Sequence, residues 1–315
     1  MVQYISSMAR RIAAEFPARL MGKQKQAFRT FLLQELADLG WEAEVVTGGR
    51  VLRSHNVVTK NPDPDIILLA HYDTIGRDPI GGLLTRLFGL NSWLLFAAGF
   101  LFGHLLTRLS ESLIRIGVSM SLSLLLTFFI GISPLIVIVA IMLIPNKYCL
   151  NDNTSGVLAL LSIARALNDY PALKQKVQLA FVDLEELGLH GSRHLRRHWL
   201  EAGVNLREKM IINFDCVGWG QVPVVCSAGE RSKSEALFRH LQSSRSDTDY
   251  GKLPSDHLSF KCEGAAGVIF ANPAPIGKSF YVPNVHSSRD VHLEPRNITW
   301  LTEEIIRFCD LRQEQ

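Results

Sequence analysis

The stretch that decides the fold is DIILLAHYDT, residues 65–74, in which a continuous apolar run ends abruptly in polar side chains. Such a run without polar interruption indicates a buried β-strand. The segments VQLAFV (177–182) and MIINF (210–214) have the same character further along the chain. Each of the three is followed at once by acidic residues or histidine. The sequence therefore predicts buried strands that end in chemically reactive side chains.

Helical patterns alternate with these strands. In residues 23–39 the apolar side chains recur at helical spacing, and Gly40 follows as a stop signal. Further helices are predicted at 155–167, 191–202 and 300–312, and further strands at 41–46, 56–59, 222–226 and 267–271. Strands that alternate with helices of this size imply a layered α/β domain with a largely parallel or mixed sheet.

Composition narrows the class of protein. The 315 residues suffice for one large domain or two modest ones, and 33 Lys and Arg residues nearly balance 30 Asp and Glu residues. A net charge of +3 argues against a nucleic-acid-binding surface, and the composition excludes disordered and fibrous proteins. The five cysteines are scattered and form no CxxC pair, which argues against a disulfide framework and a cysteine-based zinc site.

The predicted strands carry potential metal ligands where they end. His71 and Asp73 follow the first strand, Glu185 and Glu186 the second, and Asp215 the third. Functional side chains collect at the carboxyl ends of strands in α/β sheets, so we expect these residues to lie together. Two loop motifs add Asp152, within NDNTSG, and His286, within VHSSRD.

Imidazole and carboxylate groups of this number suit a pair of divalent cations, for which zinc is the usual choice. One carboxylate must then bridge the pair, and another should stay free as a base. Each piece alone has an ordinary structural explanation: an acidic pair is usually a solvated loop, and an Asp after a strand is usually a cap. The order of the whole set carries the prediction.

That order resembles the co-catalytic zinc aminopeptidase family, which includes bacterial leucyl aminopeptidases and, more distantly, glutamate carboxypeptidases and glutaminyl cyclases. The matching motifs occur in the family's order: HYDT (71–74), NDNTSG (151–156), FVDLEELGLHGS (181–192), NFD (213–215), SDH (255–257) and VHSSRD (285–290). The resemblance implies a three-layer α/β sandwich with a central mixed sheet of about eight strands.

The resemblance also implies roles for single residues. His71 and Asp215 resemble the ligands of one zinc ion, Glu186 and His286 those of a second, and Asp152 the carboxylate that bridges both. Glu185 resembles the general base, and Asp73 the carboxylate that orients His71. For Asp256 and His257, in the SDH motif, a hydrogen-bonding role and a catalytic role both stay open.

The implied activity is that of a two-zinc metallopeptidase acting on peptides, most simply an aminopeptidase. A carboxypeptidase and a glutaminyl-cyclase-like acyltransferase are alternatives on the same fold, and a catalytically silent membrane adaptor is an alternative from another class. The complete ligand set with a free base, Glu185, favours an enzyme over the adaptor. The expected partners are a peptide substrate and, as argued next, a lipid bilayer; no nucleic acid is expected, and the oligomeric state stays open.

One segment differs in composition from the rest of the chain. Residues 79–149 contain only five charged side chains: Arg86, Arg108, Glu111, Arg115 and Lys147. The runs 87–107 and 116–145 each reach the roughly 20 residues needed to cross a bilayer. We therefore predict a transmembrane helical hairpin at residues 79–145, with bilayer contact through 87–145, inserted into a discontinuous peptidase domain of residues 1–78 and 146–315.

The topology of this hairpin follows from the predicted metal centre. His71 precedes the insert and Asp152 follows it, so the chain must cross the bilayer an even number of times for both to meet. Residues 1–20 lack the continuous apolar core of a secretory signal. The sequence thus predicts an integral membrane protein with its peptidase domain in the cytoplasm.

Overall fold

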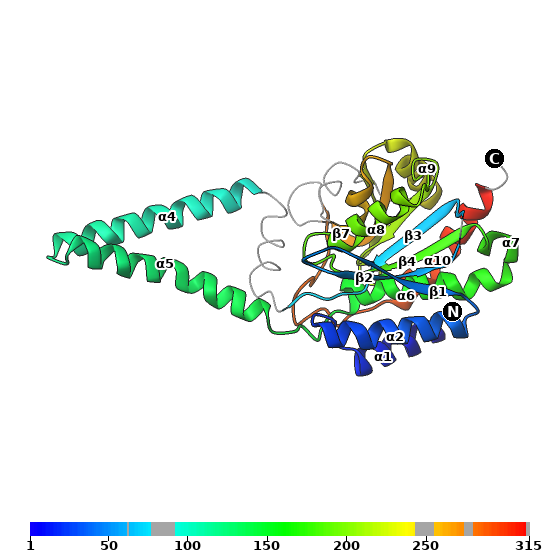
Figure 1. Cartoon of the computed structure of the whole chain (residues 1–315), viewed down its shortest axis with the longest axis horizontal. Coiled ribbons are helices and arrows are strands. Elements are labelled where there is room, and N and C mark those ends of the chain that lie inside the picture. The colour runs from blue at the N-terminus through cyan, green and yellow to red at the C-terminus, as the bar shows by residue number, and fades with distance from the viewer. Residues whose placement is uncertain (62, 77–91, 243–254, 274–279, 313–315) are drawn as a thin grey trace. The chain divides into compact units, whose positions relative to one another are not determined.

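The computed structural model describes residues 1–61, 63–76, 92–242, 255–273 and 280–312 (Figure 1). The chain divides into two compact units. The first combines Met1–Ile75 with Pro145–Gln315, and the second is Gly76–Ile144.

A mixed sheet of eight strands forms the centre of the first unit. Its order is β1-β2-β4-β3-β5-β7-β6, and β8 pairs with β7 beside this path. The neighbours β4, β3, β5 and β7 run parallel, whereas β1, β2, β6 and β8 pair antiparallel with their partners. The predicted mixed sheet of about eight strands is confirmed. The strand bounds are Ala43–Gly48 (β1), Ser54–Thr59 (β2), Ile66–His71 (β3), Val177–Val182 (β4), Met210–Phe214 (β5), Val222–Ala228 (β6), Ala265–Pro273 (β7) and Phe280–Tyr281 (β8).

Helices cover both faces of this sheet. Along the wholly buried β3, Ile66, Leu68 and Ala70 belong to one hydrophobic core, and Ile67 and Leu69 to another. Six α-helices of the described residues contribute to the first core: α1 (Val2–Glu15), α2 (Gly22–Asp38), α6 (Ser155–Ala166), α7 (Pro171–Lys174), α9 (Arg231–Leu241) and α10 (Pro295–Leu311). Helix α8 (His190–Glu201) packs into the second core, and Figure 1 shows it on the opposite side of the sheet from α1 and α2. Because helices cover both sides of the sheet, neither face of β3 is exposed.

The sequence located most of these helices to within a few residues. Helix α10 begins at Pro295, earlier than the predicted residue 300, because proline suits the first helical position and the Glu294 carboxylate accepts the N–H of Arg296. Helix α1 was not predicted. Its buried side chains Ile5, Met8 and Ile12 lie on one face, and its charged residues Arg10, Arg11 and Glu15 are exposed.

The second unit contains α4 (Ser92–Arg115) and α5 (Met120–Met142), which pack against each other. The Ser123 hydroxyl joins them by donating to the carbonyl of Ser110 at 2.9 Å. Among the helices of the described residues, none has both the length and the apolar character that crossing a membrane requires. The transmembrane hairpin predicted at 79–145, with its bilayer contact through 87–145 and the localisation derived from it, therefore lacks support. Residues 79–91 of that prediction lie outside the described part of the chain.

Candidate metal centre

The topology of the sheet brings the predicted site residues to one edge. His71 is the last residue of β3, Asp215 directly follows β5, and Glu185 and Glu186 lie in the loop after β4. These three strands are parallel neighbours, so their carboxyl ends meet at the same edge of the sheet. Asp152 reaches this edge from the short helical segment η1 (Leu150–Thr154), which leads into α6.

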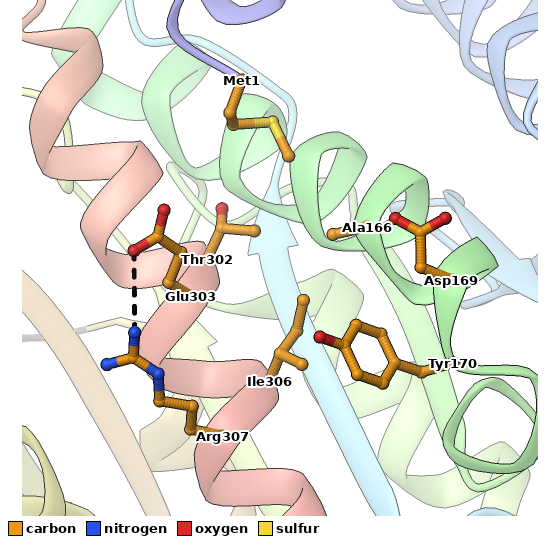
Figure 2. Close-up of a pocket in the computed structure, with 8 residues that line it drawn as sticks. All are labelled: Met1, Ala166, Asp169, Tyr170, Thr302, Glu303, Ile306 and Arg307. Carbon is orange, nitrogen blue, oxygen red and sulfur yellow. Dashed lines mark ion pairs between the residues drawn. The ribbon is translucent and has the colours of Figure 1, made fainter.

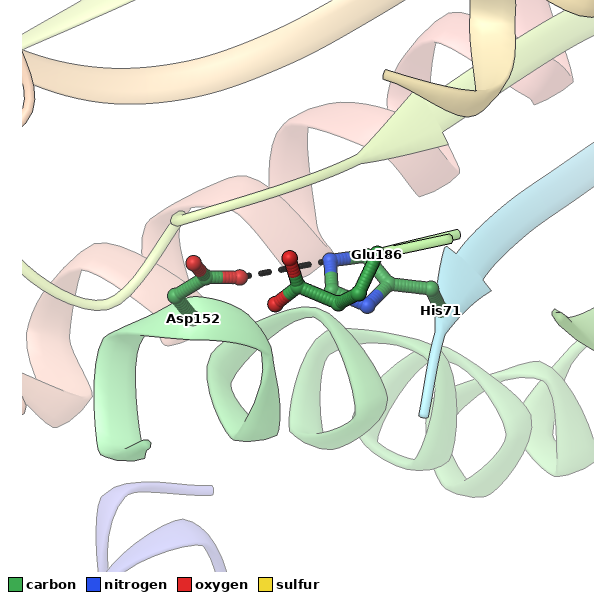
Figure 3. Close-up of side chains that lie close together, drawn as sticks. All are labelled: His71, Asp152 and Glu186. Atoms are coloured by element: carbon green, nitrogen blue, oxygen red, sulfur yellow. Dashed lines mark ion pairs between the residues drawn. The ribbon is translucent and has the colours of Figure 1, made fainter. Parts of the chain in front are cut away.

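The carboxylate of Asp152 lies between two imidazoles. Its Oδ1 is 3.3 Å from Nε2 of His71, and its Oδ2 is 2.9 Å from Nε2 of His286. His71 Nε2 is also 3.7 Å from Oδ1 of Asp215, and His286 Nε2 is 3.5 Å from Oε2 of Glu186. Figure 3 shows Asp152, His71 and Glu186 converging from three separate segments. All five predicted metal ligands thus lie in one cluster.

Several atoms of this cluster fit a bound cation. His71 Nε2, Glu186 Oε1 and Asp215 Oδ1 are buried and make no hydrogen bond within the described structure. The side chains of His71, Asp152 and Glu186 offer ligand atoms within 4.8 Å of one another, as do those of His71, Glu185 and Asp215. Buried polar atoms without partners are costly, and a metal ion would satisfy them.

The electrostatics of the cluster are consistent with that fit. Burial and then the charge of Asp152 raise the pKa of Glu186 to about 8, and burial raises the pKa of Glu185 well above its usual range. Burial alone would lower the pKa of His71, but Glu185 and the other carboxylates outweigh it and hold this pKa high. Burial opposes ionisation of Asp152, but the neighbouring imidazoles of His286 and His71 lower its pKa. The cluster carries more negative charge than its own histidines balance, which favours a cation.

Asp73 makes contacts that the sequence did not predict. Its Oδ1 accepts the backbone N–H of Glu185 at 3.1 Å, and its Oδ2 accepts that of Glu186 at 3.4 Å. The Asp73 carboxylate is 3.6 Å from Nδ1 of His71, whereas the Asp73 backbone carbonyl lies closer, at 3.2 Å. The side chain of Asp73 therefore fixes the Glu185–Glu186 loop, and its main chain contacts the imidazole of His71.

The segment around Asp152 is anchored from two sides. The carboxylate of Asp290 accepts the backbone N–H of Asn151 at 2.8 Å and that of Asp152 at 3.0 Å. On the other side, the Asn153 amide donates to the carbonyl of Phe214, at the end of β5, at 2.9 Å. No role was predicted for Asp290 from the sequence, although its place as the last residue of the motif VHSSRD could have indicated one. These bonds hold the Asp152 segment beside the strand ends.

The SDH motif contributes a further anchor. The Ser255 hydroxyl donates to Oδ2 of Asp215 at 2.6 Å and accepts from the amide of Asn213 at 2.8 Å. Its neighbours Asp256 and His257 are buried, and their side-chain polar atoms have no hydrogen-bond partner within the described residues. Burial raises the pKa of Asp256 to about 7 and lowers that of His257 to about 4.

A separate cavity of about 240 Å³ lies away from the strand ends. Its lining comes from α10, from the last residue of α6 and the residues after it, and from the N-terminus (Figure 2). Glu303 and Arg307 form an ion pair of 4.0 Å at its wall. None of the predicted site residues lines this cavity. The cluster at the sheet edge is therefore the stronger candidate for catalysis.

An α/β sheet with histidines and carboxylates gathered at the ends of its parallel strands defines a candidate metal-dependent hydrolase. The comparison with protein families specifies the class further. The family model of peptidase family M28 matches residues 142–304, and the chain belongs to this family. The resemblance found in the sequence is thereby confirmed. No curated protein gives a significant match.

Solved structures share the fold at low sequence identity. The Legionella pneumophila LapA aminopeptidase is 16% identical, with a TM-score of 0.58, over 98% of this chain and 71% of that one. The Porphyromonas gingivalis glutaminyl cyclase is 17% identical, with a TM-score of 0.63, over 99% and 98%. A Zn-dependent exopeptidase from Parabacteroides distasonis is 14% identical, with a TM-score of 0.59, over 98% and 97%.

Proposed function

We propose that this chain is a two-zinc aminopeptidase that removes N-terminal residues from peptides. The observation that carries the proposal is the position of Asp152, whose two carboxylate oxygens face His71 and His286 separately. A carboxylate between two imidazoles, each with a second acidic neighbour, is what a pair of bridged cations requires.

The proposed ligands follow from the distances. His71 and Asp215 would hold one ion, Glu186 and His286 the other, and Asp152 would bind both. When bound, zinc lowers the pKa of a water molecule and polarises a carbonyl oxygen. Asp73, Ser255 and Asp290 would keep these ligands in place, because each hydrogen-bonds either a ligand or the backbone beside one.

Glu185 is the proposed general base. Its carboxylate is buried, and it lies within 4.8 Å of ligand atoms of His71 and Asp215 without being needed in either ligand pair. At this place the carboxylate can accept a proton from the attacking water and return it to the leaving amine. Its backbone is fixed by Asp73, so the base is held relative to His71.

A glutaminyl-cyclase-like acyl transfer is the second candidate function. This chain covers 98% of the Porphyromonas gingivalis glutaminyl cyclase but 71% of the Legionella LapA aminopeptidase. Cyclisation of an N-terminal glutamine releases ammonia, whereas an aminopeptidase releases the free amino acid. Product analysis therefore separates the two candidates directly.

The test is a substrate screen on the purified full chain loaded with zinc. Free and N-terminally blocked peptides, C-terminally amidated peptides and peptides beginning with glutamine should be compared, each with and without a chelator. We expect release of N-terminal residues from every peptide with a free N-terminus, the amidated ones included, and from none that is blocked there, with elemental analysis giving two zinc ions per chain. Ammonia release from glutamine peptides without hydrolysis of others would overturn the aminopeptidase proposal, and cleavage of blocked peptides from the carboxyl end would do the same.

A further inference from the structure

A fully buried arginine joins the N-terminal segment to the candidate metal centre. Arg19 lies between α1 and α2, and only 1% of its surface is exposed. Its guanidinium lies over the ring of Phe28, at 4.8 Å from the centroid. A buried arginine is uncommon unless its donors are satisfied, so its partners indicate what it does.

Those partners lie on two segments that carry predicted ligands. Arg19 Nε donates to the backbone carbonyl of Tyr72, the residue between His71 and Asp73. Its Nη2 donates to the hydroxyl of Thr154 at 2.9 Å, two residues beyond Asp152. One planar guanidinium thus connects the end of β3 with the segment η1, although the two are far apart in sequence.

The main chain of Arg19 adds a second link to the same place. Its N–H donates to Oγ1 of Thr74 at 2.9 Å, and its carbonyl accepts the N–H of Thr74 at 3.4 Å. A third donor, Nη1, reaches the carbonyl of Phe16 at 3.2 Å, at the end of α1. Arg19 therefore has a fixed conformation, and its fork cannot turn away from Tyr72 and Thr154 without losing several bonds.

We propose that Arg19 is a positioning residue that sets the spacing of His71 and Asp152 by holding Tyr72 and Thr154 in one guanidinium fork. The inference rests on the proposed function only in that His71 and Asp152 are taken to bind metal. Ligand spacing determines metal affinity, because a metal site tolerates little error in ligand position. Lysine at this place would keep the charge but could not hold both acceptors in one plane.

The experiment measures zinc affinity by competition with a chromogenic chelator, and separately the melting temperature of the zinc-free chain. Arg19→Met removes the fork, and Arg19→Lys keeps only its charge. We expect both to raise the zinc dissociation constant about 10- to 100-fold, the usual effect of losing a group that orients metal ligands. Thr154→Val removes a single acceptor and should weaken zinc binding less. In the double variant Arg19→Met/Thr154→Val, zinc binding should be no weaker than in Arg19→Met alone.

Lys233→Met is the matched control. Lys233 Nζ donates to the backbone carbonyls of Lys209 and Glu263 at 2.8 Å each, so it too is a cation that joins main-chain segments, but it contacts none of the predicted ligand segments. This variant should lose thermal stability and keep its zinc affinity. A merely structural role of Arg19 would produce the same pattern for Arg19→Met.

The proposal is overturned if Arg19→Met and Arg19→Lys bind zinc within twofold of the wild type. It is also overturned if the effects of Arg19→Met and Thr154→Val on zinc affinity are additive. If Arg19→Met does not fold, Thr154→Val and Arg19→Lys still decide the question. A wild-type chain that binds zinc but cleaves no peptide would refute only the proposed function, whereas one that binds no divalent cation would refute both.

Discussion

Replacing Asp73 by asparagine weakens the hydrogen bonds that hold the loop of Glu185 and Glu186, but it removes no proposed metal ligand. The Asp73 carboxylate accepts the N–H groups of Glu185 and Glu186 at 3.1 and 3.4 Å. Asparagine has nearly the same shape but only one acceptor oxygen, and its amide N–H₂ would face one of these donors. The backbone carbonyl of residue 73, which contacts His71, is unchanged by the substitution.

The expected magnitude follows from these two bonds. Hydrogen bonds to a charged acceptor contribute about 1.5–3 kcal/mol each, and a neutral one about 0.5–1.5 kcal/mol. Exchanging two charged bonds for one neutral bond therefore costs about 2.5–4.5 kcal/mol. If that cost appears in the placement of Glu185, kcat/KM falls about 60- to 1,600-fold, at roughly 1.4 kcal/mol per factor of ten.

The assay compares kcat/KM, zinc content and the pH profile of Asp73→Asn with the wild type on one peptide substrate. Zinc content should stay above half of the wild-type value, because no proposed ligand is removed. The control is Asp65→Asn, which alters a surface ion pair with Lys176 at 3.2 Å and should leave kcat/KM within twofold. A kcat/KM of Asp73→Asn within threefold of the wild type would refute the reasoning.

Three further outcomes are expected. Glu185→Gln should lower kcat about 10²- to 10⁴-fold and retain zinc. Glu186→Gln should lose zinc, which elemental analysis measures. Retention of activity by Glu185→Gln would mean that the two roles are reversed. Glu186 and Asp290, whose pKa values rise from 4.5 and 3.8 to about 8, resist ionisation in the zinc-free fold. The zinc-free melting temperature should therefore fall from about pH 5 to pH 8, and zinc should raise it most at pH 8; a rise with pH in the zinc-free chain would contradict this. Ser255→Ala removes the 2.6 Å hydrogen bond to Asp215 and should weaken zinc binding about tenfold in chelator competition, and unchanged affinity would exclude that role.

The parts that the sequence predicted well are those that depend on local pattern. The apolar runs of β3, β4 and β5 indicate buried strands by themselves, and parallel strands must end at one edge of the sheet. For that reason the positions of His71 and Asp215 followed from the strand ends. The transmembrane prediction at 79–145 also used a local pattern, low charge, and no helix of the described residues supports it.

The contacts that order the cluster depend instead on tertiary structure, which explains why local pattern did not reveal them. Arg19 lies in an irregular segment between two helices, and its acceptors at Tyr72 and Thr154 are brought to it only by the packing of α1 and α2 on the sheet. A backbone carbonyl carries no residue-type signal, so no motif marks Tyr72 as its acceptor. The proposed ligands could thus be predicted from strand ends and loop motifs, whereas Arg19, which we propose sets their spacing, could be identified only from the assembled layers.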